Sequence, residues 1–516
     1  MSLPTPQRHT LHTTLAPMFG FLAAGSVAPT AWADAPAATP NDSVVSLPQI
    51  KVDGQEATST FKVDRVTSAK ISQPLLDAPQ SVTIVPQQVL KEQNAQTLQE
   101  VLRNVPGITF MSGEGNLGWG DLFSIRGFSS EQSLTVDGVR DAGMSTRTDT
   151  FNLQQAEVFK GTGSIESGVS AVGGSVNLVS KEAHLGDANK VSAGIGTDSY
   201  RRLTADLNKQ LTDTTAVRIN LMKHYNQVAD RDDVDYDRWG IATSFGFGLG
   251  TDTRFFVDTF YQKDTNTPDG GVPIQRGTDG HRMPGVKRSD WYGDSSLYTQ
   301  ENATTSLTAR FEHDFDWHDA HLRNQTRWER SDNFAVLSPA RFFVADASGK
   351  KTCTGARCAT LGYTGVGPIS QVPGSTVNAY TDYVNNSNTG HGILRGGDFG
   401  LSKRYTILDN QTDFSFTFNT GSLQHAVVSG LEFYHETYGG LKRNAEVPAG
   451  DLFFNMNDPS HSFASTYVTK GEGDPRSVID NAGVYAGDTV TLNEQWQVLG
   501  SLRYDNWRCL LYTSDA

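Results

Sequence analysis

Beyond residue 186 the chain alternates apolar and polar residues with a period of two. Within residues 203–208, leucine and alanine at the odd positions alternate with threonine, aspartate and asparagine at the even positions. The same alternation recurs over residues 217–225, 412–418 and 496–504. A period of two predicts β-strands with one apolar face and one polar face. A soluble β-sandwich and a transmembrane β-barrel both fit this pattern.

The connections between these strands favour the barrel. Tight turns lie near residues 211, 250 and 420, whereas long connections run over about 265–297, 333–404 and 438–478. Short and long connections alternate, so all tight turns fall at one end of the sheet and all long loops at the other. This asymmetry is typical of outer-membrane barrels, and a structureless loop of about 70 residues is uncommon in a compact soluble domain. We therefore expect an antiparallel transmembrane β-barrel over residues 187–508, with about eleven strands.

Residues 71–181 have a different, mixed pattern. Thr97 and Glu100 form a capping box ahead of apolar residues at helical spacing, and Pro106–Gly107 ends that helix. Short strand-like pieces surround it: SVTIVP, ITF, FSIRGF, SLTVDGVR, AEVFK and SVNLVS. The pattern predicts a compact α+β domain ahead of the barrel, and wide barrels need such a plug.

The glycine-rich stretch GTGSIESGVSAVGGSVNLVSK, residues 161–181, superficially suggests a phosphate-binding loop. A phosphate loop ends in a helix N-terminus. This stretch instead runs into an alternating segment that predicts a strand. We interpret it as the last turn and strand of the α+β domain, where glycines permit close backbone packing.

The N-terminus has the features of a secretory signal peptide over residues 1–33. Arg8 and His9 precede an apolar stretch from Leu15 to Ala24, and Ala31-Trp32-Ala33 matches a cleavage site. An alanine-rich disordered tail is the alternative. Residues 34–70 form a predicted disordered leader, which contains the short extended segment LPQIKV at residues 47–52.

Composition and chemistry exclude several classes of protein. The net charge of −14 argues against a nucleic-acid partner, and no apolar run of eighteen residues follows the N-terminus. Cys353 and Cys358 are expected to form a loop-closing disulfide, because zinc would need further ligands nearby. No nucleophile motif or HExxH motif indicates an enzyme, so we expect no catalytic residues, no metal site and no cofactor.

Five motifs follow one another in residues 77–181: DAPQSVTIVPQQVL, TLQEVLRNVPGI, FSIRGF, VDGVRD and FNLQQAEVFKGTGS with GGSVNLVSK. They resemble the successive plug motifs of the TonB-dependent receptors, most closely the siderophore receptors. LPQIKV is similar to the TonB box, which would comprise Leu47, Pro48, Gln49, Ile50, Lys51 and Val52. NAGVYAGDTVTLNEQWQVLGSLRYD is similar to a barrel segment of the family. GTGSIESGVSAVGG departs from the usual Gly-Pro-Ala and Tyr-Gly, which weakens the subfamily assignment.

The resemblance implies a monomeric receptor in the outer membrane of a Gram-negative bacterium. Its cargo would be a ferric siderophore of the catecholate type, with iron carried inside the chelator rather than as a cofactor. Its partners would be membrane lipid and a periplasmic TonB-type energy-coupling protein with its inner-membrane complex. Receptors for haem, cobalamin or glycans remain alternatives, as does a secreted β-rich adhesin or enzyme.

The resemblance also suggests functional side chains. An anionic ferric chelate favours arginine and aromatic neighbours, and the candidates on outward plug loops are Trp119, Arg140 and Arg147. Opposite charges between plug and barrel could hold the plug in place, and the candidates are Arg126 and Lys160 on plug strands with Glu432 and Glu436 on a polar strand face. Each could equally be an ordinary packing, solvated or lumen residue.

The family barrel has about 22 strands, so residues 187–508 would supply roughly its first half. An open half-barrel would leave unpaired strand edges in hydrocarbon. The alternation stops after SLRYDNWR, and CLLYTSDA at residues 509–516 matches the translated end of a sequencing adaptor. We therefore expect an incomplete chain with a non-native tail that includes the third cysteine, Cys509. A genuine short C-terminus is the alternative.

Overall fold

The computed structural model describes residues 61–68, 70–71, 73–76, 78, 80–110, 121–129, 133–141, 148–161, 163, 165, 172–272, 281–282, 285–337, 340–345, 351–353, 392–395, 399–444, 453–455, 459, 461 and 476–512. Two assemblies of strands dominate this part of the chain, a large antiparallel sheet and a smaller α+β domain. Within these residues, no helix has the length and apolarity needed to cross a bilayer.

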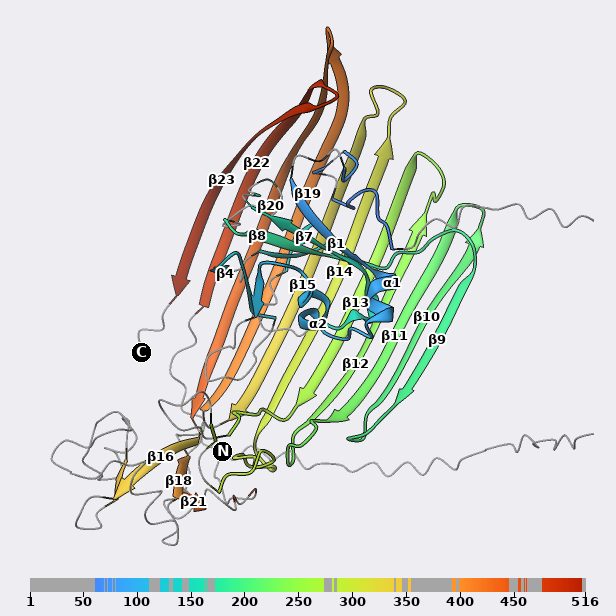
Figure 1. Cartoon of the computed structure of the whole chain (residues 1–516). Helices are drawn as coiled ribbons and strands as arrows, with labels where there is room; N and C mark the ends of the chain where they lie inside the picture. The colour runs from blue at the N-terminus through green and yellow to red at the C-terminus, as the bar shows by residue number, and fades with distance from the viewer. Residues whose placement is uncertain are drawn as a thin grey trace, which may run out of the picture. The chain divides into compact units, whose positions relative to one another are not determined.

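An eleven-stranded antiparallel sheet, here called the wall, follows residue 187, as Figure 1 shows. Its strands are β9 Ala188–Ile195, β10 Arg201–Thr212, β11 Thr215–Gln227, β12 Asp235–Phe247, β13 Thr253–Asn266, β14 Thr299–Asp314, β15 His321–Leu337, β19 Phe399–Thr420, β20 Leu423–Asn444, β22 Arg476–Asn493 and β23 Trp496–Tyr512. They pair in chain order, with β9 and β23 at the two edges. The predicted number of strands is therefore confirmed.

The faces of the wall are the reverse of those in a soluble sandwich. Leucines on one face are exposed, for example Leu203 at 53% and Leu502 at 78%, whereas Asn208 and Asp409 on the other face are fully buried. Water-soluble sheets bury the apolar face, so a buried polar face beside an exposed apolar face is the arrangement of a sheet that faces lipid. The alternation thus belongs to a membrane wall with a polar interior.

The connections confirm the predicted asymmetry. Tight turns join β10 to β11, β12 to β13, β14 to β15, β19 to β20 and β22 to β23. Antiparallel pairing places all of these at one end, here called the short-turn end. At the opposite end, β9–β10 and β11–β12 are also joined by short connections, but the three predicted long connections follow β13, β15 and β20. Four short strands from the last two of these form a separate sheet: β16 Ala340–Ala345, β17 Lys351–Cys353, β18 Gly392–Arg395 and β21 Phe453–Asn455.

The plug domain has the predicted mixed architecture. Its elements are β1 Ser81–Pro86, α1 Gln87–Glu92, α2 Leu98–Leu102, β2 Ile108–Phe110, β3 Phe123–Ile125, β4 Phe128–Ser129, β5 Leu134–Val136, β6 Val139–Arg140, the 3₁₀ helix η2 Thr150–Asn152, β7 Leu153–Lys160 and β8 Gly174–Ser180. One sheet has the order β1-β7-β8-β5-β6, and β2, β3 and β4 form another. The core lies where Leu98 and Leu102 of α2 pack with Val158 of β7.

Local signals in the sequence explain most of these elements. The capping box is confirmed, because the Thr97 side chain accepts from the Glu100 backbone while the Glu100 side chain accepts from the Thr97 backbone. Helix α1 was not predicted. FSIRGF is two strands rather than one, since Arg126 and Gly127 have positive φ and form a turn. Arg126 therefore lies in that turn and not on a strand.

The glycine-rich stretch ends as predicted in the last plug strand, β8. A Cβ added to Gly173 would lie 2.1 Å from the carbonyl oxygen of Ile125, and one added to Gly174 would lie 2.1 Å from that of Phe159. Only glycine permits this close approach of three backbone segments. The stretch thus serves packing within the plug domain.

Strand β23 continues beyond the predicted end of the wall. Its residues pair with β22 as far as Tyr512 with Arg476. Cys509 is therefore part of a strand, where it is exposed and free. The wall extends four residues beyond the expected boundary at residue 508, because residues 509–512 continue the antiparallel pairing with residues 476–479 of β22.

Candidate functional site

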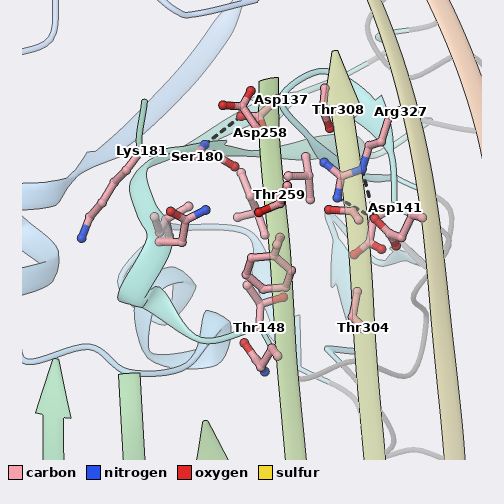
Figure 2. A pocket seen from close by; sticks show the side chains of 18 of the residues that line it. Asp137, Asp141, Thr148, Ser180, Lys181, Asp258, Thr259, Thr304, Thr308 and Arg327 are labelled. Carbon is pink, nitrogen blue, oxygen red and sulfur yellow. Dashed lines mark hydrogen bonds and ion pairs between the residues drawn. The ribbon is translucent and has the colours of Figure 1, made fainter. Parts of the chain in front are cut away.

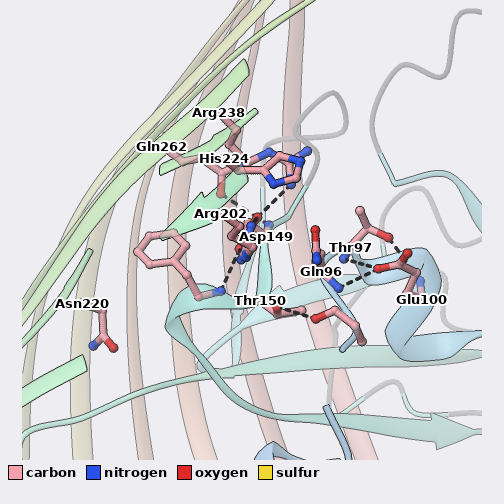
Figure 3. A network of polar contacts seen from close by, with 12 residues as sticks. Gln96, Thr97, Glu100, Asp149, Thr150, Arg202, Asn220, His224, Arg238 and Gln262 are labelled. Atoms are coloured by element: carbon pink, nitrogen blue, oxygen red, sulfur yellow. Dashed lines mark hydrogen bonds and ion pairs between the residues drawn. The ribbon is translucent and has the colours of Figure 1, made fainter. Parts of the chain in front are cut away.

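The plug domain is attached to the polar face of the wall by a buried carboxylate, Asp149. Asp149 precedes η2 and caps it, accepting a hydrogen bond from the Phe151 backbone N–H at 2.9 Å. Its Oδ1 accepts from Nη2 of Arg202 on β10 at 2.6 Å, and its Oδ2 accepts from Nη1 of Arg238 on β12 at 2.9 Å. Figure 3 shows the carboxylate between the two guanidinium groups. One plug residue thus joins two wall strands.

The electrostatics of this contact keep Asp149 charged. Burial by itself raises the pKa of Asp149, but the charges and hydrogen bonds of Arg202 and Arg238 outweigh burial and lower the pKa to about 2. Arg238 is in turn paired with Asp264 of β13. A buried carboxylate with several donors and two cations remains ionised at neutral pH, so the contact persists under physiological conditions.

An apolar contact adjoins this ion-pair cluster. The Phe151 ring, two residues after Asp149, packs with Met222 and Ala242 of the wall. It stacks on Phe260 with ring centroids 5.8 Å apart. A Cβ at Gly240 would come within 2.8 Å of the Phe151 ring, so the absence of a side chain there makes room for it. We call Asp149 and Phe151 together the η2 anchor.

A second attachment lies at the exit of the plug domain. Lys181 donates to the carbonyl oxygen of Phe151 at 2.6 Å and pairs with Asp206 of β10 at 3.1 Å. Arg218 of β11 holds the same carboxylate, with Nε 2.8 Å from Oδ1 of Asp206. Burial lowers the pKa of Lys181, and the attraction of Asp206 only partly opposes this, so the pKa stays below its usual value. This lysine ties the last plug strand to the first long strands of the wall.

A third attachment joins β6 to the later part of the wall. Nη1 of Arg140 donates to the Tyr434 hydroxyl at 3.3 Å, and Nη2 lies 3.5 Å from Oε2 of Glu436. The guanidinium also lies 5.7 Å from the centre of the Tyr434 ring. Arg140 and Glu436, which were assigned to different roles from the sequence, are therefore brought together across the interface.

Between these attachments a cavity lies between the plug domain and strands β12–β15. Figure 2 shows its labelled carboxylates Asp137 and Asp141 from the plug domain and Asp258 from β13, with Lys181 and Arg327 as cations. Arg327 donates to Glu329, its neighbour on the same face of β15. Val136, Leu178 and Phe260 also line the cavity, so its lining contains both charged and apolar groups. The plug–wall interface thus combines ionic contacts with apolar ones.

The remaining predicted residues lie in different places. Lys160 is the last residue of β7, and Arg126 is exposed. Glu432 is buried on the polar face of β20 and pairs with Arg503 of β23 rather than with the plug domain. Trp119, Arg147 and the proposed TonB box at residues 47–52 lie outside the described residues. Of the expected disulfide pair, Cys353 ends β17 and Cys358 lies outside the described residues, so the pairing stays a prediction.

Reasoning from the sequence missed the η2 anchor. The signal that could have found it is the run Asp149-Thr150-Phe151-Asn152, which has an N-cap residue followed by an aromatic residue. The arginines that receive Asp149 occupy polar positions of alternating strands, where nothing in the sequence distinguishes them from other lumen charges. Their convergence depends on the register of β10, β11 and β12.

Comparisons with known proteins agree with this architecture. A family model for the TonB-dependent receptor plug domain matches residues 74–175. The chain is 34% identical over 463 residues to the catecholate siderophore receptor Fiu of Escherichia coli (strain K12), which covers 87% of this chain and 55% of that relative. The chain thus spans little more than half the length of the relative.

Two solved structures have the same fold. The closed form of the ferric-catecholate import receptor Fiu from E. coli gives a TM-score of 0.71 at 31% identity, covering 88% of this chain and 60% of that chain. The siderophore receptor PiuA from Acinetobacter baumannii gives a TM-score of 0.73 at 26% identity, covering 89% of this chain and 62% of that chain. The plug domain, the inverted wall and these similarities lead to one assignment. The chain belongs to the TonB-dependent receptors of the Gram-negative outer membrane.

Proposed function

We propose that this receptor takes up ferric siderophores of the catecholate type from outside the cell into the periplasm. The observation that carries the proposal is a plug domain attached to the polar face of a lipid-facing wall, in a chain 34% identical to a catecholate siderophore receptor. A plug held by a few ion pairs and one aromatic contact can loosen without unfolding its own core around α2. The fold therefore suits gated passage of a polar cargo.

Cargo recognition would depend on arginine and aromatic side chains at the outward end of the plug domain. A ferric catecholate is anionic and aromatic, so guanidinium groups and ring faces are its natural partners. We propose Trp119, Arg140 and Arg147 for this role. Arg140 would contact both the cargo and the wall, because its contacts with Tyr434 and Glu436 also hold β6 against the wall.

Energy would arrive through the TonB box. The outer membrane has no nucleotide supply, so work must be delivered mechanically from the periplasm. We propose that residues 47–52 pair as an added strand with an edge of a TonB-type protein, where backbone hydrogen bonds provide the affinity. The receptor would act as a monomer with the iron bound only inside its cargo.

Growth on defined iron sources tests this function. A strain deprived of its other iron receptors and given this receptor should grow on a ferric catecholate and accumulate its iron. The same strain without the receptor is the control. Growth only on haem, or uptake only of cobalamin or a glycan, would assign the receptor to another cargo. Extraction of the protein without detergent would contradict the membrane function altogether.

A further inference from the structure

A buried carboxylate in the plug sheet takes no part in the attachments described above. Glu157 lies on β7, paired with Ile84 of β1 and Asn177 of β8, and its side chain is fully buried. Burying a carboxylate costs free energy unless hydrogen-bond donors satisfy it. The donors that Glu157 uses therefore show which parts of the plug domain depend on it.

On one side Glu157 holds the segment that leads into the plug domain. Its Oε1 accepts from the Thr67 backbone N–H at 2.7 Å, from the Thr67 hydroxyl at 3.0 Å and from Nε2 of Gln155 at 2.8 Å. Thr67 follows the end of the proposed TonB box, Val52, by fifteen residues. The backbone N–H and the hydroxyl of Thr67 both donate to this one oxygen, so Glu157 is a firm point of attachment for this segment.

On the other side Glu157 reaches the β5–β6 hairpin through one intermediate. Its Oε2 accepts from Nδ2 of Asn177 at 2.9 Å. Oδ1 of Asn177 accepts from the Gly138 backbone N–H at 2.9 Å and from the Thr135 hydroxyl at 3.0 Å. Asn177 and Thr135 are both nearly inaccessible to solvent, at 4% and 6%. The side-chain amide of Asn177 therefore links the carboxylate to the hairpin.

The hairpin itself contacts the wall. Asp137 and Gly138 both have positive φ, as a tight two-residue turn requires. The Asp137 carbonyl oxygen accepts from Nη2 of Arg323 on β15 at 3.1 Å. Arg140 at the end of β6 makes the contacts with Tyr434 and Glu436. The hairpin thus connects the buried network to two separate parts of the wall.

We propose that Glu157 and Asn177 form a relay that couples the segment around Thr67 to the β5–β6 hairpin. Drawing Thr67 away leaves the buried carboxylate without two of its donors. The Asn177 side chain must then either rotate toward Glu157 or lose its hydrogen bond to that carboxylate. Either change moves Oδ1 of Asn177 away from the Gly138 N–H and the Thr135 hydroxyl, which both donate to it. The hairpin and Arg140 consequently separate from the wall before the core around α2 opens. The inference rests on the proposed function in one respect only, because a TonB-type protein would supply the force that draws Thr67 away.

Hydrogen exchange followed by mass spectrometry tests the relay in the detergent-solubilised receptor without cargo or TonB. Thr67→Val removes one donor to Glu157 at the surface end. We expect exchange to rise about fivefold or more in residues 61–68 and also in residues 134–140, because losing a hydrogen bond to a buried acceptor lowers the cost of local opening. Exchange in β2 and β3 should stay unchanged. Thr109→Val, at an exposed position on β2, is the matched control and should leave residues 134–140 unaffected.

The reverse perturbation distinguishes a relay from two local effects. Asn177→Ala should raise exchange in residues 61–68 as well as in the hairpin, because coupling between two sites is reciprocal. A rise confined to the mutated end in either variant, or an equal rise throughout the plug domain, would overturn the proposal. Neither readout involves uptake, so a receptor that failed to transport a ferric catecholate would leave this test intact.

Discussion

Asp149 of the plug domain and Arg238 of the wall form an ion pair whose atoms lie 2.9 Å apart, although the residues are 89 positions apart in the chain. The Asp149 side chain is fully buried, and that of Arg238 is only 8% exposed. Together with Arg202, this pair joins η2 to two wall strands. Such a contact holds the plug domain by charge in an interior that is otherwise polar.

Replacing Asp149 with asparagine should loosen the plug domain. The change removes the carboxylate that pairs with Arg202 and leaves Arg238 with Asp264 alone, and breaking a buried ion pair typically costs about 3–5 kcal/mol. Urea unfolding of the solubilised receptor, followed by plug-specific hydrogen exchange, measures the loss. Asp187→Asn is the matched control, because Asp187 pairs with Lys209 at an exposed position and its removal should leave the unfolding midpoint unchanged. Equal midpoints in the two variants would remove Asp149 from the anchor.

The stability of the plug domain should fall as the pH drops from about 4 to about 2. Its ion pairs lower the pKa of Asp149 from 3.8 to about 2, so the unfolded state binds more protons in this range. The contribution is fully present above the unfolded pKa and is lost as the pH falls through the folded pKa. It amounts to about 2 kcal/mol at 1.36 kcal/mol per pKa unit. Unfolding midpoints measured across this range should slope less in Asp149→Asn than in the wild type, and identical slopes would contradict the assignment.

Trp119→Ala and Arg140→Ala should each weaken binding of a ferric catecholate by about 1–3 kcal/mol, the usual range for a true contact. Quenching of ligand or tryptophan fluorescence gives the affinity. Arg103→Ala removes an exposed arginine at the end of α2 and serves as the control. Glu436→Gln helps to separate the two roles of Arg140, since it removes the charged wall partner but keeps the guanidinium and its contact with Tyr434. Unchanged affinity in Trp119→Ala and Arg140→Ala would exclude both residues from the cargo site.

Ile50→Pro should abolish uptake and leave chelate binding intact. Proline removes a backbone donor from the proposed added strand, so pairing with the TonB-type protein loses a hydrogen bond that the segment requires. Uptake of radioactive iron and equilibrium binding are measured on the same cells. Ala38→Pro, in the leader ahead of the box, is the control and should transport normally. Wild-type uptake by Ile50→Pro would refute the assignment of residues 47–52.

Gly173→Ala should destabilise the plug domain by about 1–3 kcal/mol, as overpacking usually does. The added methyl group would meet the Ile125 carbonyl oxygen at 2.1 Å, whereas nothing lies within 4 Å of a Cβ at Gly500. Gly500→Ala is therefore the control. The urea midpoint of the plug transition provides the measurement. A stable Gly173→Ala variant would show that the backbone segments can separate without loss.

Several elements followed from local sequence because local physics determines them. The capping box at Thr97 and Glu100 lies within one helical turn. SLTVDGVR, expected as one strand-like piece, is instead two strands joined by a turn at Asp137 and Gly138, which both have positive φ. Alternation along each strand predicted the wall, and the lengths of its connections predicted its two ends. Helix α1 escaped notice because its N-cap residue, Pro86, supplies no side-chain cap, whereas the equally short α2 has the capping box of Thr97 and Glu100.

The contacts between distant residues were decided only by the tertiary structure. From the sequence, Arg140 is a candidate for cargo binding and Glu436 a candidate for holding the plug through Arg126 or Lys160, yet strand register and plug position place Arg140 and Glu436 3.5 Å apart. The same applies to Asp149 with Arg202, and to Glu157 with Thr67. Sequence alone determined that one strand face is polar and the other apolar. Which polar residues meet depends on the register of each strand pair, and a shift of register by one residue would change every cross-strand pair.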